Sequence, residues 1–483
     1  SAQSACAIGT YQPSMGQSTC LDADAGHYVA STAATSQTAC AAGTYQPSTG
    51  QATCFDADPG NFSIGSHYPV FTSISTTYGT SCGIDENGTV FCWGNNDHGQ
   101  LGDGTNQRSP IAVQTVSFGQ GRSATDITMG YSHACAILDN GSVSCWGEND
   151  EGQLGDGSQT DRNVPTQTIS LGPGRTATAI SAGWRHTCVI LDNGSVNCWG
   201  YNSHGQLGDG SSTSRPTPDY TSPLISGRTA VKIAAGQSNT CVILDDGSVA
   251  CWGSDYGIDG NSQVPTQVNP FGANRTAVEI TSGEGGHTCV ILNDGNVSCW
   301  GPNSYGQLGD GTTTSRFSPT ETSSLGPGVS AVEISAGWRH TCAVLDNGNA
   351  SCWGKNEYYQ LGDGTQNTRL VPTPISSPGS GRTVSSISGT YYHTCAILDS
   401  GNISCWGSNG MGATGVVWGF GNTQTPTPIM INHLSYFSIN QTPCHTGTYQ
   451  SSTGQTSCAD ASAGHYVAST GQSAQTACAA GTY

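Results

Sequence analysis

Apolar and polar positions follow one pattern in a segment of about fourteen residues that recurs seven times. In the copy at residues 187–200, TCVILDNGSVNCWG, apolar and β-branched residues run up to Asp192-Asn193-Gly194 and resume after it. This pattern predicts a β-hairpin whose three-residue loop places glycine in the left-handed conformation. A glycine occupies that slot in every copy: Gly88, Gly141, Gly194, Gly247, Gly295, Gly348 and Gly401.

The spacing of the copies predicts how the hairpins are organised. The first cysteines of successive copies are 53, 53, 53, 48, 53 and 53 residues apart, a period that holds one small antiparallel sheet. A strand such as 331–335 precedes each hairpin, and a turn-rich GQLGDGT-type loop and a short VPTPI-like strand follow it. We therefore predict an all-β fold, a seven-bladed β-propeller over residues 69–438 with small disulfide-rich modules at both ends.

Each hairpin carries two cysteines separated by nine residues, with a tryptophan after the second. Counting outward from the loop, Leu191 faces Ser195 and Cys188 faces Cys198, at a position where Cα atoms approach to roughly 4.5 Å. That distance lies within disulfide reach, whereas the spacing is not one of zinc ligands. The predicted disulfides are Cys82–Cys92, Cys135–Cys145, Cys188–Cys198, Cys241–Cys251, Cys289–Cys299, Cys342–Cys352 and Cys395–Cys405.

The other seven cysteines lie in short modules, at residues 1–34, 35–68, 439–472 and, cut short, 473–483. They alternate with 13 and 19 intervening residues, and units this small depend on disulfides. The preferred pairing is Cys6–Cys20, Cys40–Cys54 and Cys444–Cys458, which leaves Cys478 without a partner within this chain. The alternative pairs cysteines across the longer gaps and joins Cys54 to Cys444.

Charge and cysteine content exclude several partners. Acidic residues outnumber basic ones 33 to 14, a net charge of -19, which argues against nucleic acid and against anionic membrane surfaces. No run approaches the roughly 20 apolar residues of a membrane span. Paired cysteines at this density are typical of an oxidising compartment, so we expect an extracellular or cell-surface location.

Nine N-x-[ST] sequons agree with secretion, and those at residues 87, 140 and 193 fall at hairpin tips, where a glycan points into solvent. The predicted glycosylation sites are Asn61, Asn87, Asn140, Asn193, Asn274, Asn296, Asn349, Asn402 and Asn440.

Two resemblances follow from these motifs. The recurring H-T-C-x-x-L-x-x-G-x-V-x-C-W-G-x-N-x-x-G-Q-L-G-D-G resembles the regulator-of-chromosome-condensation (RCC1-like) repeat over some 360 residues, whose members form seven-bladed propellers. The terminal GTYQ-S-x-G-Q stretches resemble ephrin-receptor-like and tumour-necrosis-receptor-like cysteine-rich repeats. Two loops depart from the RCC1-like pattern: residues 253–260 are shortened, and residues 407–415 lose Gln-Leu. The first copy has Thr80 in place of the histidine.

Candidate chemistry recurs with the repeat, which favours architecture over catalysis because a catalytic group is expected to be singular. In the RCC1-like family the histidine packs within the blade, and the residues in question here are His133, His186, His287, His340 and His393. Ten arginines recur at two positions, where we expect rings that tie neighbouring blades, with an anion-binding rim as the alternative: Arg122, Arg175, Arg228, Arg275 and Arg382, and Arg108, Arg162, Arg215, Arg316 and Arg369. We predict no enzyme activity and no catalytic, cofactor-binding or metal-binding residue.

Two further features have a structural and a functional interpretation. Trp184-Arg185 and Trp338-Arg339 offer a stacking surface for a partner chain or a glycan, although loop variation also explains them. The GDG loops suggest calcium as the one conceivable cofactor, but each has few carboxylates and its glycines already explain a turn. Their acidic residues are Asp103, Asp156, Asp209, Asp310 and Asp363.

Three functions follow from the sequence. The first is an extracellular structural protein, a glycosylated bead on a cysteine-rich stalk that self-associates head to tail into a filament or surface appendage. SAQSACAIGTY at residues 1–11 matches SAQTACAAGTY at residues 473–483, as expected for tandem units or joined subunits; an arbitrary boundary in a stalk of short modules explains the match equally. The second is a secreted adhesin or inhibitor-type binding module that uses the propeller face. The third, guanine-nucleotide exchange, is the activity that the family resemblance implies, but the secretory marks oppose it.

Overall fold

The computed structural model describes residues 69–119, 121–258, 260–379, 381–415 and 422–429, together with residues 6–8, 10–11, 20–23, 27–40, 44–45, 52–56, 61–62, 442–443, 448–449, 459–460, 465–466 and 476–477. The chain forms two compact units. Pro69–Ile431 is one, and Ser1–Tyr68 with Asn432–Tyr483 is the other.

The larger unit contains seven four-stranded sheets, numbered here as blades 1 to 7. Blade 1 comprises β8 (Phe71–Thr77), β9 (Thr80–Asp85), β10 (Val90–Gly94) and β11 (Ser109–Gln114). Blade 2 comprises β12 (Ala124–Met129), β13 (His133–Leu138), β14 (Val143–Gly147) and β15 (Arg162–Gln167). Blade 3 comprises β16 (Ala177–Ala182), β17 (His186–Leu191), β18 (Val196–Gly200) and β19 (Arg215–Tyr220). Blade 4 comprises β20 (Ala230–Ala235), β21 (Asn239–Leu244), β22 (Val249–Asp255) and β23 (Gly260–Gln267).

The remaining blades repeat this order. Blade 5 comprises β24 (Ala277–Ser282), β25 (Thr288–Leu292), β26 (Val297–Gly301) and β27 (Arg316–Glu321). Blade 6 comprises β28 (Ala331–Ala336), β29 (His340–Leu345), β30 (Ala350–Gly354) and β31 (Arg369–Pro374). Blade 7 comprises β32 (Val384–Gly389), β33 (His393–Leu398), β34 (Ile403–Gly407) and β35 (Thr423–Pro428).

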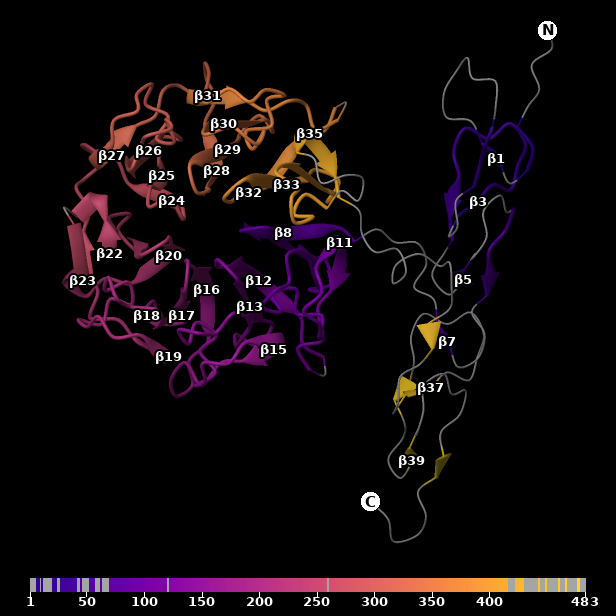
Figure 1. Ribbon diagram of the computed structural model, residues 1–483, viewed down its shortest axis with the longest axis horizontal. Helices are drawn as coiled ribbons and strands as arrows, with labels where there is room; N and C mark the ends of the chain where they lie inside the picture. The colour runs from indigo at the N-terminus through magenta and orange to yellow at the C-terminus, as the bar shows by residue number, and fades with distance from the viewer. Residues whose placement is uncertain are drawn as a thin grey trace. The chain divides into compact units, whose positions relative to one another are not determined.

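The blades form a ring with the first strand of each innermost and the fourth outermost (Figure 1). Every blade is built from consecutive antiparallel strands, so in the described residues no strand from one end of the ring completes a blade at the other. The ring closes where β8 meets blade 7: the Phe71 amide donates to the Gly401 carbonyl, in the hairpin between β33 and β34, at 2.8 Å, and the Thr76 amide donates to Ser388 Oγ of β32 at 3.1 Å. The predicted all-β seven-bladed propeller is confirmed.

The hairpin geometry follows the prediction closely. The Leu191 amide donates to the Ser195 carbonyl at 2.8 Å, Gly194 has φ +75°, and Cys188 lies opposite Cys198. The seven hairpin disulfides all form, with Cα atoms 4.0 to 4.1 Å apart. Each blade therefore carries its own buried cross-strand staple.

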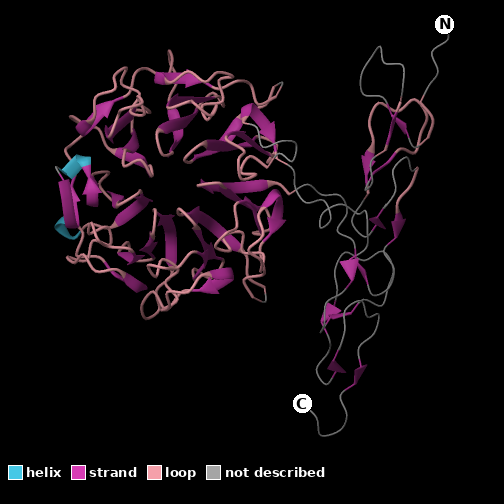
Figure 2. Cartoon of the chain, in the orientation of Figure 1, coloured by secondary structure: helices cyan, strands magenta, loops and turns pink. Residues whose placement is uncertain are grey.

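Strands and loops make up nearly all of the described chain (Figure 2). Its helices are two 3₁₀ turns, η1 (Ile225–Gly227) and η2 (Tyr256–Ile258). No described helix has the length and apolar character to cross a membrane.

The smaller unit consists of two-stranded ladders and confirms part of the predicted cysteine pairing. Its strands are β1 (Thr10–Tyr11), β2 (Leu21–Asp22), β3 (His27–Tyr28), β4 (Thr38–Ala39), β5 (Thr44–Tyr45), β6 (Phe55–Asp56), β7 (Asn61–Phe62), β36 (Thr442–Pro443), β37 (Thr448–Tyr449), β38 (Ala459–Asp460), β39 (His465–Tyr466) and β40 (Thr476–Ala477). Disulfides join Cys6 to Cys20 and Cys40 to Cys54, so the alternative bond from Cys54 is wrong. Cys444, Cys458, Cys478 and the predicted boundary at residue 438 lie outside the described residues.

The sequence did not predict one pairing in this unit. Strand β7, before the propeller, pairs antiparallel with β36, after it, placing Thr442 opposite Phe62. The modules that precede and follow the propeller therefore belong to one unit.

Candidate functional site

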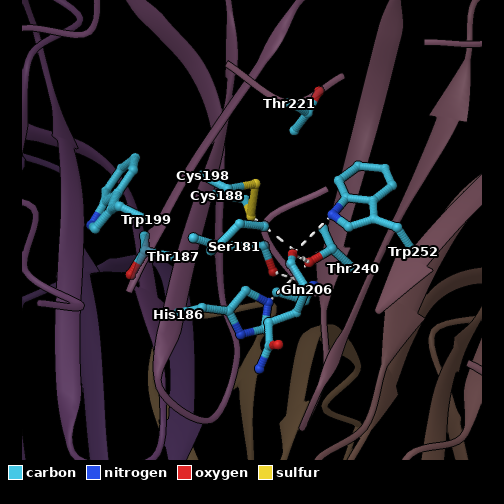
Figure 3. Close-up of a disulfide and its surroundings, with 12 residues drawn as sticks. Ser181, His186, Thr187, Cys188, Cys198, Trp199, Gln206, Thr221, Thr240 and Trp252 are labelled. Carbon is cyan, nitrogen blue, oxygen red and sulfur yellow. Dashed lines mark hydrogen bonds between the residues drawn. A yellow bond between two sulfur atoms is a disulfide. The ribbon is translucent and has the colours of Figure 1, made fainter. Parts of the chain in front are cut away.

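A buried set of hydrogen bonds joins each blade to the next and sets the positions of the surface loops. Between blades 3 and 4, His186 Nε2 lies 2.9 Å from Thr240 Oγ1, which donates to the Gln206 carbonyl at 2.9 Å (Figure 3). Because the threonine hydroxyl has one proton and gives it to that carbonyl, the imidazole donates. Trp252 Nε1 donates to the same carbonyl at 2.8 Å, so one backbone oxygen of blade 3 holds two side chains of blade 4.

The five histidines recur in this role. Each pairs with a hydroxyl of the following blade, in the pairs His133–Thr187, His186–Thr240, His287–Thr341, His340–Thr394 and His393–Ser81. The ring also packs against its own blade, as the resemblance implies, because His186 lies beside Gly183 of the loop that precedes it. Burial lowers the pKa of these imidazoles to about 3 or 4, and they remain neutral partners of the next blade.

Two junctions depart from this arrangement. At the junction of blades 1 and 2 both partners change, because Thr80 replaces the histidine and Ala134 replaces the threonine. At the junction of blades 4 and 5, where the loop after β22 is shortened, Asn239 Nδ2 donates to Asp255 Oδ2 at 2.7 Å. Asp255 Oδ1 accepts from Trp300 Nε1 at 2.9 Å, so a carboxylate substitutes for the missing loop carbonyl.

The alternation of strand direction gives the ring two distinct faces. The loops between first and second strands and between third and fourth strands emerge on one side, here called the AB face. The hairpins between second and third strands and the connections between blades emerge on the other, here called the hairpin face. Neighbouring blades touch on both faces: the Tyr131 amide donates to the Trp184 carbonyl on the AB face, and on the hairpin face the Ala177 amide, at the start of β16, donates to the Gly141 carbonyl of the preceding hairpin.

The AB face carries an aromatic patch. The residue two positions before the histidine slot is half-buried and aromatic in five blades, as Tyr78, Tyr131, Trp184, Trp338 and Tyr391. Three more rings extend the patch outward over blades 5 to 7: Tyr305, Tyr358 and Tyr392.

The rings of the patch touch one another across blades. Tyr78 stacks on Tyr131 with centroids 5.2 Å apart, and Trp338 stacks on Tyr391 at the same distance. Tyr78 and Tyr391 meet edge to face at 5.2 Å. The first and last blades are thus linked at the surface by ring contacts, and the patch is continuous from blade 6 through blade 7 to blade 2.

Three cations lie against these rings, and one of them has no acidic partner. The Arg339 guanidinium carbon is 3.9 Å from the Trp338 ring centroid and 4.7 Å from that of Tyr305. All fourteen lysines and arginines lie in described parts of the propeller, and thirteen of them form ion pairs with carboxylates. Arg339 is the exception, which is notable in a chain of net charge -19.

The other two cations are paired. Arg185 lies 5.5 Å from the Trp184 centroid and forms an ion pair of 2.7 Å with Glu148 of the preceding blade. Lys355 is 93 % buried, lies 5.1 Å from the Tyr305 centroid, and pairs with Glu357 at 3.0 Å. The predicted contact residues Trp184, Arg185, Trp338 and Arg339 therefore all belong to the aromatic patch.

Glu284 is the residue of this face that sequence reasoning missed most plainly. Blade 5 has one extra residue in its first loop, and Glu284 accepts from the Thr77 hydroxyl of blade 1 at 3.2 Å, reaching across the ring. Its second carboxyl oxygen, Oε2, is buried with no hydrogen-bond partner. Burial raises the pKa of Glu284 to about 8, and burial together with this carboxyl raises the pKa of Tyr391.

A cavity of about 240 Å³ opens at the edge of the aromatic patch, between blades 7 and 1. Tyr78, Tyr358 and Tyr392 line it with Met411, and the buried His393 lies among its lining residues. The loop that lost Gln-Leu supplies one wall, so this departure from the repeat coincides with a hollow in the surface.

The arginine rings need correction, and the same contacts bear on the GDG loops. Arg162 and Asp156 pair at 2.8 Å, and Arg175 and Asp192 pair at 3.3 Å, in each case within one blade. The recurring arginines therefore fasten loops of their own blade and do not tie neighbouring blades. In four of the five GDG loops the aspartate carboxylate is held by such an arginine, a neighbour that disfavours a bound cation: Asp156, Asp209, Asp310 and Asp363.

When the seven repeats are aligned, the position two residues before the histidine slot reveals the aromatic residues that the sequence analysis did not single out. Tyr78, Tyr131 and Tyr391 occupy the same column as the two tryptophans that were singled out. Reading that column across all seven copies identifies the patch, whereas Tyr305 and Tyr358, in loops between third and fourth strands, become its neighbours only in the folded ring.

Comparisons with known proteins agree with this architecture. Two models described as the regulator of chromosome condensation (RCC1) repeat match the chain, one over residues 71–100, 124–153, 177–206, 230–257, 277–307, 331–360 and 384–413, the other over residues 87–137, 140–190, 193–243, 294–344 and 347–397. A model described as tyrosine-protein kinase ephrin type A/B receptor-like matches residues 4–40.

Individual relatives cover the propeller. The chain is 31% identical to the ultraviolet-B receptor UVR8 of Arabidopsis thaliana over 330 residues, which are 67% of this chain and 73% of the receptor. It is 26% identical to the human E3 ubiquitin-protein ligase HERC2, matching 68% of this chain but 7% of the ligase. The crystal structure of Prp20p from Saccharomyces cerevisiae superposes with a TM-score of 0.64 at 21% identity, covering 72% of this chain and 87% of that one.

Proposed function

The chain belongs to the family of RCC1-repeat propellers, and on this premise we propose that it is an extracellular recognition module that binds a protein partner through the aromatic patch of its AB face. The observation that carries the proposal is Arg339. Its guanidinium lies against two aromatic rings, it is half-buried, and it has no carboxylate partner in a chain with a large excess of acid. A planar cation held in this way is prepared for a carboxylate of another molecule.

The composition of the patch favours a protein partner. Tryptophan, tyrosine and arginine dominate it, with Met411 at its edge, and these residue types are enriched where protein interfaces concentrate their binding energy. The rings already contact one another in the free chain, so little side-chain entropy remains to be lost on binding.

The extracellular part of the proposal is supported by the disulfides. All seven blades carry one, and at least two more fasten the N-terminal modules. Such density is typical of proteins made in an oxidising compartment. RCC1-repeat relatives include a secretion-regulating guanine nucleotide exchange factor of Bos taurus, an activity that does not accord with this oxidised chain.

The alternative of a structural bead that repeats head to tail into a filament stays a prediction. Cys478, which we expect to lack a partner within this chain, lies outside the described residues. A bead with only a spacing function needs no unpaired arginine on an aromatic surface, and for this reason we place the binding module first.

Binding of the full secreted chain to an array of extracellular proteins and, separately, of glycans tests the proposal. We expect binding to at least one protein, weakened about tenfold or more by Trp338→Ala or by Arg339→Ala, as is usual for interface anchors. Arg339→Lys keeps the charge and loses the planar fork, so it should restore binding only in part.

The matched control lies on the hairpin face. Arg175 is exposed and pairs with Asp192, and Arg175→Ala should leave binding unchanged. Equal losses from Arg175→Ala and Arg339→Ala would overturn the assignment to the AB face, and binding confined to glycans would overturn the protein partner.

A further inference from the structure

Sequons on the propeller all lie on one face. Six of the seven described ones fall in the hairpins between second and third strands, and Asn274 falls in the connection before β24, so all emerge on the hairpin face. Their asparagines are all exposed: Asn87, Asn140, Asn193, Asn274, Asn296, Asn349 and Asn402.

Asparagine itself is not confined to that face. The described loops between third and fourth strands, on the AB face, contain Asn95, Asn96, Asn106, Asn149, Asn202, Asn303, Asn356, Asn367 and Asn409. None of these has serine or threonine two residues later. The one-sided distribution of sequons therefore does not follow from the distribution of asparagine.

We propose that the propeller is N-glycosylated only on its hairpin face, at Asn87, Asn140, Asn193 and Asn274, and that the sequons at Asn296, Asn349 and Asn402 are closed by folding. The aromatic patch on the opposite face is thereby left bare. The proposal rests on the extracellular location given under the proposed function, but not on the identity of any partner.

In the first group of sequons, the asparagine side chain and the hydroxyl two residues later are both accessible. In Asn140-Gly141-Ser142 the asparagine occupies the loop, and the half-buried Ser142 hydroxyl donates to Asn140 Oδ1 at 2.7 Å. Asn193 and Ser195 repeat this contact at 2.7 Å. Within the described residues, Nδ2 of neither asparagine has a hydrogen-bond partner, so the nitrogen that takes the sugar is free.

The other two members of this group are accessible as well. Thr89, two residues after Asn87, is half-buried, as is Thr276, two residues after Asn274. In each case the hydroxyl that identifies a sequon remains at the surface of the folded blade.

The second group is displaced by two positions along the hairpin. Asn296, Asn349 and Asn402 follow the loop glycine, so the serine two residues later lies within the third strand of the blade. Ser298, Ser351 and Ser404 are 3%, 2% and 0% exposed. A transferase that must bind the hydroxyl can read these sequons only before the hairpin closes.

The reaction is transfer from a lipid-linked pyrophosphoryl oligosaccharide by the membrane transferase of the secretory pathway. The bond from C1 of the first sugar to the phosphate oxygen breaks, a bond from C1 to asparagine Nδ2 forms, the amide loses one proton, and the lipid pyrophosphate leaves. The asparagine therefore needs a free Nδ2 and an accessible hydroxyl two residues later, the two properties that separate the groups.

Site occupancy tests the proposal directly. The full chain is secreted from a eukaryotic cell line, its glycans are released with peptide-N-glycosidase in ¹⁸O-water, and each converted asparagine is quantified by mass spectrometry. We expect occupancy at the four open sites to exceed that at Asn296, Asn349 and Asn402 by about fivefold or more.

One substitution supplies a matched variant in the same hairpin. Blade 6 reads Asp346-Asn347-Gly348-Asn349, and Asn349→Ser turns it into the sequence of blade 3. The exposed position carries little folding risk. The variant removes the closed sequon and creates an open one at Asn347, which we expect to become occupied to the level of Asn193.

Equal occupancy of the two groups, or an unoccupied Asn347 in Asn349→Ser, would overturn the closing of sequons by folding. A secreted chain without glycans at the four open sites would overturn the glycosylation itself while leaving the binding proposal intact. Conversely, a chain that is glycosylated as expected but binds no protein on the array would overturn only the proposed function.

Discussion

Trp184 and His186 are two residues apart, yet they belong to regions that follow opposite rules. His186 lies in the buried layer between blades, where His, Thr, Trp and the carbonyl of Gln recur with little change. Trp184 lies on the AB face, where the equivalent residue is tyrosine, tryptophan, glutamine or glycine. The repeat therefore holds one layer constant and lets the neighbouring layer vary.

The difference arises from what each position touches. A buried residue must match a partner in the next blade, so its changes occur in pairs, as with Thr80 and Ala134 or with Asn239 and Asp255. A half-exposed residue on the AB face has solvent on one side and varies without such coupling. Variation concentrated on one surface of a repeated fold marks the place where individual function is built.

The strongest test of this comparison is acidification. Burial lowers the pKa of the five histidines from 6.5 to about 3 or 4, so the unfolded chain binds more protons than the folded chain below pH 6.5. The free energy of unfolding should be fully present above that pH and should fall by up to about 1.4 kcal/mol per pH unit for each histidine as the pH drops. Urea unfolding at pH 7 and pH 4.5 measures the loss.

A single substitution assigns this acid sensitivity to the buried layer. His186→Asn introduces the residue that blade 4 carries at Asn239. It should reduce the dependence of the free energy of unfolding on pH by the contribution of one histidine. Glu284 acts in the opposite sense, because its raised pKa favours the folded state at low pH and loses that contribution as the pH rises from 4.5 to about 8. Equal stability at pH 4.5 and pH 7 would contradict the assignment.

Next in size is a pair of tryptophan substitutions that separates the two layers. Trp252 is fully buried and donates to the Gln206 carbonyl, and Trp252→Ala should cost about 3–5 kcal/mol of unfolding free energy. Trp338→Ala on the AB face should cost about 1–2 kcal/mol, from lost ring contacts. Chemical denaturation of the two variants measures both values, and similar costs would mean that the AB face is structural too.

The smallest expected effect concerns the junction where the buried layer was rebuilt. Asp255→Ala leaves Trp300 Nε1 and the Gly257 amide without their acceptor, which should cost about 3 kcal/mol. Asp255→Asn keeps that acceptor, and Asn239 can turn its unpartnered Oδ1 toward the new amide, so its cost should be about 1 kcal/mol. Thermal unfolding of both variants gives the comparison, which fails if the asparagine variant is the less stable one.

Much of this architecture was predictable because the seven copies of the repeat can be aligned with one another within a single sequence. The hairpin loop at Gly194, the pairing of Cys188 with Cys198 and the number of blades all follow from local spacing and strand alternation. The aromatic column was also present in the sequence, although only its two tryptophans were singled out.

Contacts between blades were not predictable in the same way. The spacing does not predict the hydrogen bond from His186 to Thr240 of the next blade, and the arginines that we expected between blades pair within their own blade. Local periodicity fixes which residues face inward, but it does not say whether a buried group meets its own sheet or the next one.

The sequence by itself determined the blades and their disulfides, because hairpins and cross-strand cysteines are short-range features that each repeat specifies alone. Only the tertiary structure decided what lies together on the two faces. Ring closure brings Tyr78 onto Tyr131 and Tyr391 and lets Glu284 reach Thr77, residues separated by 53, 313 and 207 positions. The closure of the ring brings these residues together, and the sequence of a single repeat does not specify that closure.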